Sequence, residues 1–301
     1  MTEPVHGSVC PEPARSATER ALLRLHCTVL LRSKAPPSVG GMNLAYDDLG
    51  SGQPVLLVHG HPFDRSMWRP QAEHLAKSGY RVITPDLRGY GTSPTQDKTT
   101  GLDVFADDLV ELADQLELAS FVLGGLSMGG QIVMQLVRDH PGRVEALLLA
   151  DTFAGLDTPQ AKQARYDTAD RITEEGMEQY AEELLPKMIS KETRATRPDV
   201  ETHVHRMMRN APKEGAAAAL RGRAERPDYT PTLKHIDVPT LVVVGSEDEF
   251  TPVSDAELIQ REIGPSTLVV IEGAGHLPNL EREAEFNDAL TTFLTSSGAT
   301  S

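Results

Sequence analysis

Short apolar runs alternate with amphipathic stretches along the chain from residue 42 onward. The segment MNLAYDDLG alternates apolar and polar residues before the turn GSGQP, whereas VLLVHG (55–60) is a continuous apolar run, typical of a strand buried on both faces. The same signals predict strands over 81–87, 120–126 and 144–151 and helices near 66–78, 102–117 and 128–139. Because strands separated by helices pair in parallel, the pattern predicts an α/β protein with a mostly parallel central sheet flanked by helices.

The strand-like runs stop between about residues 155 and 230, where the pattern is that of several helices rich in Glu, Arg, Ala and Met. Alternation resumes with strands over 240–246 and 266–273 and helices near 253–263 and 281–295. A helical insert in such a sheet is most simply a lid over its carboxyl edge, where ligands bind. We therefore predict a core formed by 38–154 and 231–301, with a helical lid, 155–230, inserted after the sixth strand.

The predicted lid carries several large apolar or aromatic side chains. Side chains of this kind line substrate pockets, but their helical spacing favours packing on the sheet for most of them. They are Tyr166, Met177, Tyr180, Leu184, Leu185, Met188, Met207 and Met208.

Residues 1–37 lack this alternation and are rich in Arg, Pro, Ser and Ala. We predict a poorly ordered extension, because charges interrupt its apolar stretch and no small-residue cleavage site follows, unlike a secretory signal. The two cysteines, Cys10 and Cys27, offer neither a disulfide framework nor zinc-ligand spacing, which favours a reducing, cytoplasmic location. No apolar run approaches the roughly 20 residues that span a bilayer, so no membrane partner is expected.

The net charge of −15 narrows the choice of partner. A protein that binds nucleic acid would need a basic surface to meet the phosphates, so nucleic acid is not expected as a partner. We expect a small-molecule substrate, and assembly into a homo-oligomer stays open.

The stretch GGLSMGG (124–130) follows a predicted strand and precedes a predicted helix. It contains G-x-S-x-G centred on Ser127, in the strand–turn–helix context of a nucleophile elbow. The alternative is a glycine-rich turn or a phosphate-binding loop. The stretch lacks the Lys-Ser/Thr ending of a P-loop and the glycine spacing of a dinucleotide-binding turn, which favours the elbow.

A serine nucleophile needs a histidine base and a carboxylate that orients it. His276 follows the predicted strand 266–273 and would lie at the sheet's carboxyl edge, whereas His235 precedes its strand. Asp248 is the favoured acid, because its loop ends sharply at a proline and follows the strand next in sequence to that of His276. The other acids after strand ends are Asp151, Glu247 and Glu249.

The loop HGHPFDRSMW (59–68) follows another predicted strand. In this architecture the backbone N–H of His61 and that of Met128, directly after the serine, would form an oxyanion hole. A metal site of His59, His61 and Asp64 is the alternative for this loop. It is disfavoured because the loop lacks further ligands nearby and the HVH stretch (203–205) falls on the predicted lid.

From about residue 42 to 296 the chain resembles the α/β-hydrolase superfamily. The resemblance rests on five blocks in family order: VLLVHGHPFDRSMW, PDLRGYGTS, GGLSMGG, VGSEDEFTP and GAGHLPNLE. Among its members, GLSMGG and the closing HLPNLEREAEFNDALTTFL look most like 3-oxoadipate enol-lactonases and related bacterial esterases, and HGHPFD resembles the cofactor-free haloperoxidase (perhydrolase) group. Asp248 matches the G-x-x-D-x-x-T-P pattern of the resembling esterases.

This resemblance implies a serine hydrolase that cleaves a small ester or lactone through an acyl-enzyme. Ser127 would be the nucleophile, His276 the base and Asp248 the orienting acid, and neither a cofactor nor a metal would be needed. Two rival functions stay open: perhydrolysis or C–C bond hydrolysis by the same residues, and ligand binding without catalysis. Family members with an aspartate nucleophile are excluded by Ser127.

Overall fold

The computed structural model describes residues 43–94 and 97–298 of the chain. The predicted extension, 1–37, lies outside these ranges. Core and predicted lid both fall within a single compact unit, 31–301, so the division of the chain at residues 155 and 230 stays a prediction. Among the helices of the described ranges, none is long and apolar enough to cross a bilayer.

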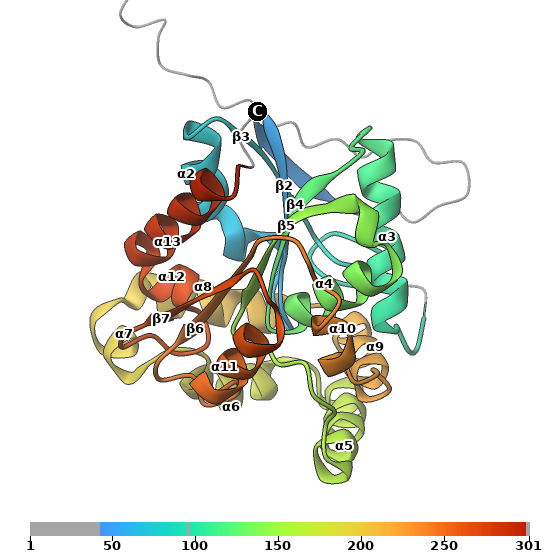
Figure 1. The fold of residues 1–301 in the computed structure, drawn as a ribbon. Helices are drawn as coiled ribbons and strands as arrows, with labels where there is room; N and C mark the ends of the chain where they lie inside the picture. Colours follow the sequence, from blue (N-terminus) through green and yellow to red (C-terminus); the bar gives the residue numbers. More distant parts are fainter. Residues whose placement is uncertain (1–42, 95–96, 299–301) are drawn as a thin grey trace, which may run out of the picture. The chain divides into compact units, whose positions relative to one another are not determined.

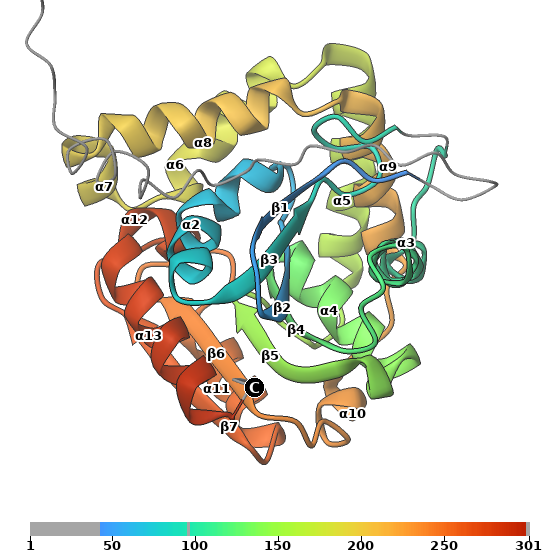
Figure 2. The same cartoon turned by 90° about the horizontal axis from the view of Figure 1, so that it is seen from above.

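In the described residues seven strands form one sheet in the order β1-β3-β2-β4-β5-β6-β7 (Figures 1 and 2), which the view from above in Figure 2 shows with β1 labelled. They are β1 (Tyr46–Gly50), β2 (Gln53–Val58), β3 (Tyr80–Pro85), β4 (Phe121–Leu126), β5 (Val144–Ala150), β6 (Thr240–Gly245) and β7 (Ser266–Ile271). Only β1 runs antiparallel to its neighbour within this sheet, and the other strands pair in parallel. The predicted sheet is therefore confirmed, and its parallel strands all end at one edge.

Helices cover both faces of the sheet, as Figures 1 and 2 show from two directions. One face carries α3 (Leu102–Gln115), α4 (Met128–Asp139) and α11 (Val253–Glu262), and the other carries α2 (Arg69–Lys77) and α13 (Glu283–Ser296). Each face has its own cluster of buried apolar side chains. The continuous apolar runs predicted as strands are thus buried on both sides, as parallel strands require.

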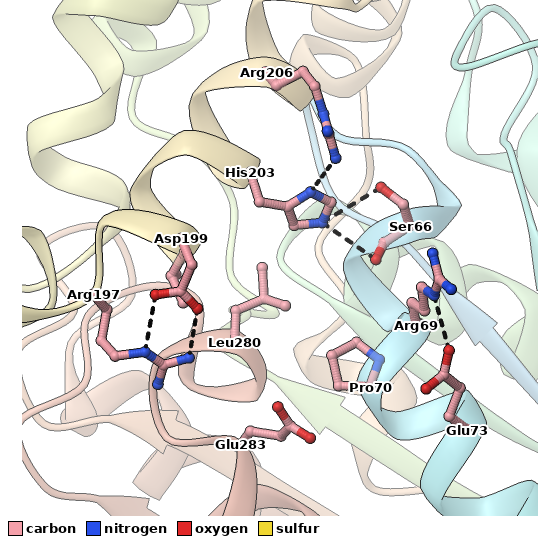
Figure 3. Close-up of a pocket in the computed structure, with 11 residues that line it drawn as sticks. Ser66, Arg69, Pro70, Glu73, Arg197, Asp199, His203, Arg206, Leu280 and Glu283 are labelled. Carbon is pink, nitrogen blue, oxygen red and sulfur yellow. Dashed lines mark hydrogen bonds and ion pairs between the residues drawn. The ribbon is translucent and has the colours of Figure 1, made fainter.

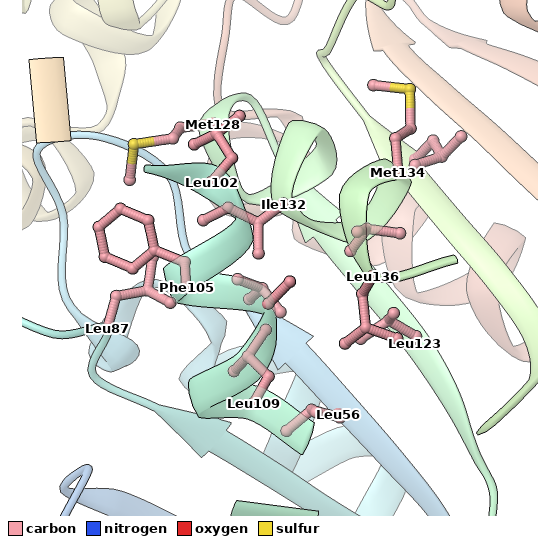
Figure 4. Packing of buried hydrophobic residues seen from close by; sticks show 14 of the residues in the cluster. Leu56, Leu87, Leu102, Phe105, Leu109, Leu123, Met128, Ile132, Met134 and Leu136 are labelled. Atoms are coloured by element: carbon pink, nitrogen blue, oxygen red, sulfur yellow. The ribbon is translucent and has the colours of Figure 1, made fainter. Parts of the chain in front are cut away.

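Leucine and phenylalanine side chains dominate the contact between α3, α4 and the sheet, shown in Figure 4. Leu102, Phe105 and Leu109 recur three or four positions apart on α3, which places them on one side of the helix. There they pack with Ile132 and Leu136 of α4, and all five are at most 3% exposed. Burying a side chain of this size contributes about 1.5–3 kcal/mol, so this layer fixes α4 on the sheet.

Between β5 and β6, the insert comprises α5 (Pro159–Glu175), α6 (Glu178–Met188), α7 (Lys191–Thr196), α8 (Pro198–Asn210) and α9 (Lys213–Ala224), and the short α10 (Thr230–Leu233) follows it. The insert follows the fifth strand of the described residues, not the sixth as predicted, because a single antiparallel strand precedes β2 there. Met188, Met207 and Met208 are buried against the α2 and α13 face, as their helical spacing predicts. The short elements are η1 (Arg65–Trp68), η2 (Pro141–Arg143), α10 (Thr230–Leu233) and α12 (Pro278–Glu281).

Candidate active site

Ser127 lies in the turn between β4 and α4, with φ 58° and ψ −117°. Serine rarely adopts a positive φ, and such strain at the end of a buried strand is characteristic of a nucleophile elbow. The turn is fixed on both sides, because Ser127 N–H donates to the carbonyl of Ala150 at 2.9 Å and Thr152 Oγ1 donates to the Ser127 carbonyl at 2.8 Å. The serine is 5% exposed and stands at the carboxyl edge of the sheet.

The glycines around Ser127 allow the close approach of backbone to backbone. A Cβ at Gly125 would lie 2.4 Å from the Gly129 carbonyl, and a Cβ at Gly129 would lie 2.2 Å from the Val58 carbonyl oxygen. Backbone atoms cannot move aside as a flexible side chain can. The turn therefore needs glycine at both positions, which explains the G-x-S-x-G spacing.

His276 lies beyond β7, and its Nδ1 is 2.7 Å from Oδ2 of Asp248, which lies beyond β6. A carboxylate can only accept, so Nδ1 carries the proton and Nε2 is left as the basic nitrogen. Both side chains are buried, with His276 2% and Asp248 7% exposed as whole residues. The sequence argument for His276 and Asp248 as neighbours agrees with this distance.

Asp248 is held by further hydrogen bonds. Phe250 N–H donates to Oδ1 at 2.8 Å and Thr251 Oγ1 donates to Oδ2. Burial alone would raise the pKa of Asp248, but the charge and hydrogen bond of His276, together with these two donors, lower it below its ordinary value. Asp248 is therefore ionised and fixed in orientation.

Asp151, the rival acid, directly follows β5 and is 1% exposed. Its Oδ1 accepts the N–H of Gly245 at 2.9 Å, while its buried Oδ2 has no hydrogen-bond partner among the described residues. Burial raises the pKa of Asp151 well above its ordinary value, and the negative charges of Asp248 and Glu281 raise it further. The uncharged form of Asp151 is thus favoured beside Asp248.

Asp151, Asp248 and His276 each offer one possible metal-ligand atom, and the three atoms lie within 4.8 Å of one another. The hydrogen bonds described above already use the ring Nδ1 and the facing Asp248 oxygen. A proton on Asp151 accounts for the closeness of two carboxyl groups as simply as a cation would. The three side chains therefore need no bound cation to lie this close together.

The loop after β2 lies against the serine, because a Cβ at Gly60 would be 3.2 Å from Ser127 Cβ. Within the described residues, the backbone N–H groups of His61 and Met128 have no intramolecular acceptor. Met128 also opens α4, whose N-terminus carries partial positive charge. These two N–H groups are therefore available to an oxyanion beside Ser127.

The side chain of His61 is held by two tyrosines that sequence reasoning did not connect with it. Its Nδ1 is 2.7 Å from the hydroxyl of Tyr90 and its Nε2 is 3.2 Å from the hydroxyl of Tyr180, which comes from α6. Burial lowers the pKa of His61 well below its ordinary value, and the positive charges of Arg223 and Arg165 lower it further. His61 is thus neutral, and it ties the β2 loop to the helical insert.

The alternative metal site in this loop is not supported by its contacts. His59 Nε2 accepts the N–H of Leu87 at 3.0 Å and its Nδ1 is 2.9 Å from the Gly60 carbonyl. Asp64 Oδ1 accepts Ser66 N–H at 2.8 Å as the cap of η1. Since both nitrogens of His61 face tyrosines, each of the proposed ligands already has another partner.

A cavity of about 390 Å³ lies away from these residues, between η1, α2 and the α7–α8 part of the insert, as shown in Figure 3. His203 points across it to Ser66, and Arg206 contacts the His203 ring at 2.8 Å. Two ion pairs also lie along the cavity, Arg69 with Glu73 at 2.8 Å and Arg197 with Asp199 at 3.0 Å. Ser66 Oγ lies 3.5 Å from His203 Nε2, but His203 Nδ1 faces Arg206 and no carboxylate of the described residues bonds this ring, so the pair lacks the orienting acid of a catalytic triad.

Glu281 was not predicted from the sequence, yet it organises the His276 loop. Its Oε1 accepts the N–H of Gly275 at 2.9 Å, and its Oε2 accepts the N–H of Ser190 at 2.7 Å. Glu281 is 1% exposed and thereby joins the loop to the start of α7. Nothing in its spacing from His276 distinguishes it from a surface glutamate at a helix end.

Comparison with known proteins is consistent with this arrangement. The chain matches the family described as alpha/beta hydrolase fold over residues 53–283. A thermophilic esterase from Thermogutta terrifontis, solved with malate bound, is 41% identical with a TM-score of 0.84, covering 89% of this chain and 97% of that one. The 3-oxoadipate enol-lactonase 2 of Acinetobacter baylyi is 31% identical over 75% of this chain and 82% of its own. A bromoperoxidase from Bacillus anthracis is 27% identical with a TM-score of 0.76, covering 84% of this chain and 96% of that one.

Proposed function

The chain belongs to the alpha/beta hydrolase fold family, and from this premise we propose that it hydrolyses a small ester or lactone through an acyl-enzyme on Ser127. It is a hydrolase, as its esterase and lactonase relatives are named. The proposal assigns His276 as the general base and Asp248 as the group that orients it. It assigns the oxyanion hole to the backbone N–H groups of His61 and Met128.

In the first half of the reaction, Ser127 Oγ attacks the carbonyl carbon while His276 Nε2 takes the hydroxyl proton. The ionised Asp248 stabilises the imidazolium that forms, through the hydrogen bond to Nδ1. The carbonyl oxygen gains negative charge and accepts the N–H groups of His61 and Met128. Collapse of this intermediate transfers the proton from His276 to the leaving alcohol oxygen and leaves an ester on Ser127.

In the second half, water attacks the ester on Ser127, again with His276 Nε2 as the base. The same two N–H groups stabilise the second oxyanion. Collapse breaks the bond to Ser127 Oγ, which recovers its proton from His276, and the carboxylic acid leaves. A lactone follows the same steps, except that its alcohol and acid stay in one molecule.

The observation that carries the proposal is the pairing of a buried, ionised Asp248 with His276 at 2.7 Å, on the sheet edge that also presents the strained Ser127. This combination has no evident structural purpose, since a strained serine and a buried carboxylate charge both cost stability. The esterase and enol-lactonase relatives support the substrate class.

A panel of 4-nitrophenyl esters and small lactones tests the proposal. Ser127→Ala should lower kcat by roughly 10⁴-fold or more on every substrate that the wild type hydrolyses, because the three residues act as a unit. Ser66→Ala, a serine in η1, serves as the matched control and should stay within about threefold. Ester turnover that survives Ser127→Ala would overturn the proposal.

The bromoperoxidase relative favours perhydrolysis as a second candidate function. Here hydrogen peroxide replaces water in the second half and attacks the ester on Ser127, which releases a peracid and the free serine. The peracid then oxidises a halide. Acetate-dependent and peroxide-dependent bromination that disappears in Ser127→Ala would support this activity, and its absence in the wild type would exclude it.

A further inference from the structure

Three arginines and one aspartate form a buried cluster where α5 and α9 of the insert meet the core. Arg165, Arg223 and Arg226 surround Asp157, so three positive charges face one negative charge and the cluster carries a net charge of +2. This occurs in a chain whose net charge is −15. Burying an excess of positive charge lowers the stability of a fold unless an anion pairs with it.

Two of the arginines pair with Asp157. Arg165 binds Asp157 with two hydrogen bonds, of 2.7 and 3.0 Å. Arg226 Nη2 lies 3.6 Å from Asp157 and donates to the carbonyl of Gly155 at 2.5 Å, and its guanidinium stacks 4.6 Å from the ring centre of Phe153. These two side chains fix the segment that leads from β5 into the insert.

Arg223 is different, because most of its donors have no protein acceptor. Its Nε donates to Oε1 of Gln131 at 2.7 Å, and within the described residues no acceptor lies in reach of either Nη group. No carboxylate of these residues forms a salt bridge with it, although the whole residue is only 8% exposed. Neither Nη is sealed from solvent, in contrast to the buried, unpaired Nε of Arg226. Both Nη groups of Arg223 are therefore left without an acceptor in the described part of the protein, although the residue is largely buried.

Arg223 is joined to the helix that begins directly after Ser127. Gln131, the partner of Arg223, stands one helical turn after Ser127 on α4, and its N–H donates to the Ser127 carbonyl at 3.2 Å. The charge of Arg223 is the largest charge acting on His61, whose N–H is assigned to the oxyanion hole, and it also lowers the pKa of Tyr180. Gln131 and His61 thus place the guanidinium beside the substrate's position without contact to the triad.

We propose that the Nη groups of Arg223 bind a carboxylate of the substrate, so that the substrates are esters or lactones that carry a free carboxylate away from the reacting carbonyl. This inference rests on the proposed function. A guanidinium with both Nη groups free matches a carboxylate with two parallel hydrogen bonds. The bound carboxylate would reduce the net charge of the cluster from +2 to +1.

The electrostatics agree with this assignment. Burial and the positive charges of Arg165 and Arg226 lower the pKa of Arg223 well below its ordinary value, which measures how unfavourable the isolated cation is in this place. An anion is the ligand that removes this penalty, whereas a neutral apolar group would increase it. Esters whose acyl group is purely apolar should therefore be the poorer substrates.

The experiment compares a neutral and an anionic ester of similar length, 4-nitrophenyl butyrate and mono-4-nitrophenyl glutarate. The wild type should have the higher kcat/KM for the glutarate. Arg223→Gln, which keeps one amide donor and removes the charge, should lower kcat/KM for the glutarate by about 30-fold or more and change that for the butyrate by less than about threefold. Arg221→Gln is the matched control, because Arg221 lies on the same helix and pairs with Asp170 at 2.7 Å.

A ratio of the two kcat/KM values that is the same in wild type and Arg223→Gln would overturn the carboxylate site and leave the proposed hydrolase function intact. If Arg223→Gln does not fold, Gln131→Glu takes its place, since a carboxylate at that position would occupy the guanidinium and should abolish the glutarate preference. If the wild type hydrolyses neither ester, the binding of succinate to the wild type and to Arg223→Gln is measured by isothermal titration calorimetry. Binding that is lost in the variant supports the site, and absence of binding to the wild type overturns it.

Discussion

Asp151→Asn should leave the fold intact and change how the free energy of unfolding depends on pH. Asparagine has the shape of the neutral carboxylic acid that Asp151 presents, and its oxygen can accept the Gly245 N–H that now bonds Oδ1 at 2.9 Å. Its amide can donate toward Asp248. The backbone φ of 44° at this position is one that asparagine tolerates well.

The magnitude follows from proton linkage. The pKa of Asp151 is raised in the folded protein, by burial first and then by Asp248 and Glu281, so above the ordinary carboxyl pKa the folded state keeps a proton that the unfolded state has lost. Wild-type stability must then fall by about 1.4 kcal/mol per pH unit until the folded group also ionises. Asparagine has no such proton. Over the same interval, the free energy of unfolding of the variant should therefore rise relative to that of wild type by about 1.4 kcal/mol for each unit of increasing pH.

Urea denaturation of both proteins at pH 4.5, 5.5 and 6.5 measures this difference. Asp248→Asn is the control, because the linkage between its charge and stability has the opposite sign. The pKa of Asp248 is lowered in the folded state, so the stabilisation that its charge contributes is lost only as the pH falls below the ordinary carboxyl range. A difference between Asp151→Asn and wild type that does not change with pH would refute the reasoning. It would mean that Asp151 is ionised in the folded protein and is a competitor of Asp248.

The same pair of variants separates the two candidate acids in activity: Asp248→Asn should lower kcat by at least about a hundredfold and Asp151→Asn by less than about fivefold, measured on the best ester of the panel. A larger loss of kcat in Asp151→Asn than in Asp248→Asn would mean that Asp151 is the acid that orients His276. Gly129→Ala should destabilise the protein by about 3 kcal/mol or more in urea denaturation, because the new Cβ would lie 2.2 Å from the Val58 carbonyl oxygen, whereas Gly142→Ala, with open space around it, should cost under about 1 kcal/mol. A similar loss of stability in both variants would show that the close contact of Gly129 with the Val58 carbonyl is not the cause. Removal of residues 1–37 should shift the melting temperature by less than about 2 °C, because the first described strand begins only at Tyr46. A large decrease would mean that the extension packs on the core.

The fold and the order of its elements could be predicted from the sequence because its signals are local. Continuous apolar runs such as 55–60 and 240–246 identify buried parallel strands, and each predicted strand lies within a few residues of an observed one. GGLSMGG specifies its own turn, since Gly125 and Gly129 leave room that any side chain would fill. In a parallel sheet, residues that follow different strands meet at one edge, which is why Ser127, Asp248 and His276 could be grouped in advance.

The remaining features depend on contacts between distant segments, which no local pattern encodes. The neutral state of Asp151 arises from Asp248, nearly a hundred residues later, and from complete burial. Tyr180 and Arg223 come from the helical insert, where their spacing is that of ordinary helix residues, and only packing brings them to His61 and Gln131. The insert was predicted after the sixth strand and follows the fifth strand of the described residues, although the helices α5 to α9 fall within its predicted range, 155–230.

The most direct test of the account is covalent labelling of the nucleophile. The protein is treated with phenylmethylsulfonyl fluoride until ester hydrolysis stops, and the modified peptide is identified by mass spectrometry. We predict one sulfonyl group per chain, on Ser127, because among the serines of the described residues only Ser127 has a positive φ, at the sheet edge that also presents the buried His276–Asp248 pair. Modification of a different serine, or complete labelling without loss of turnover, would contradict it.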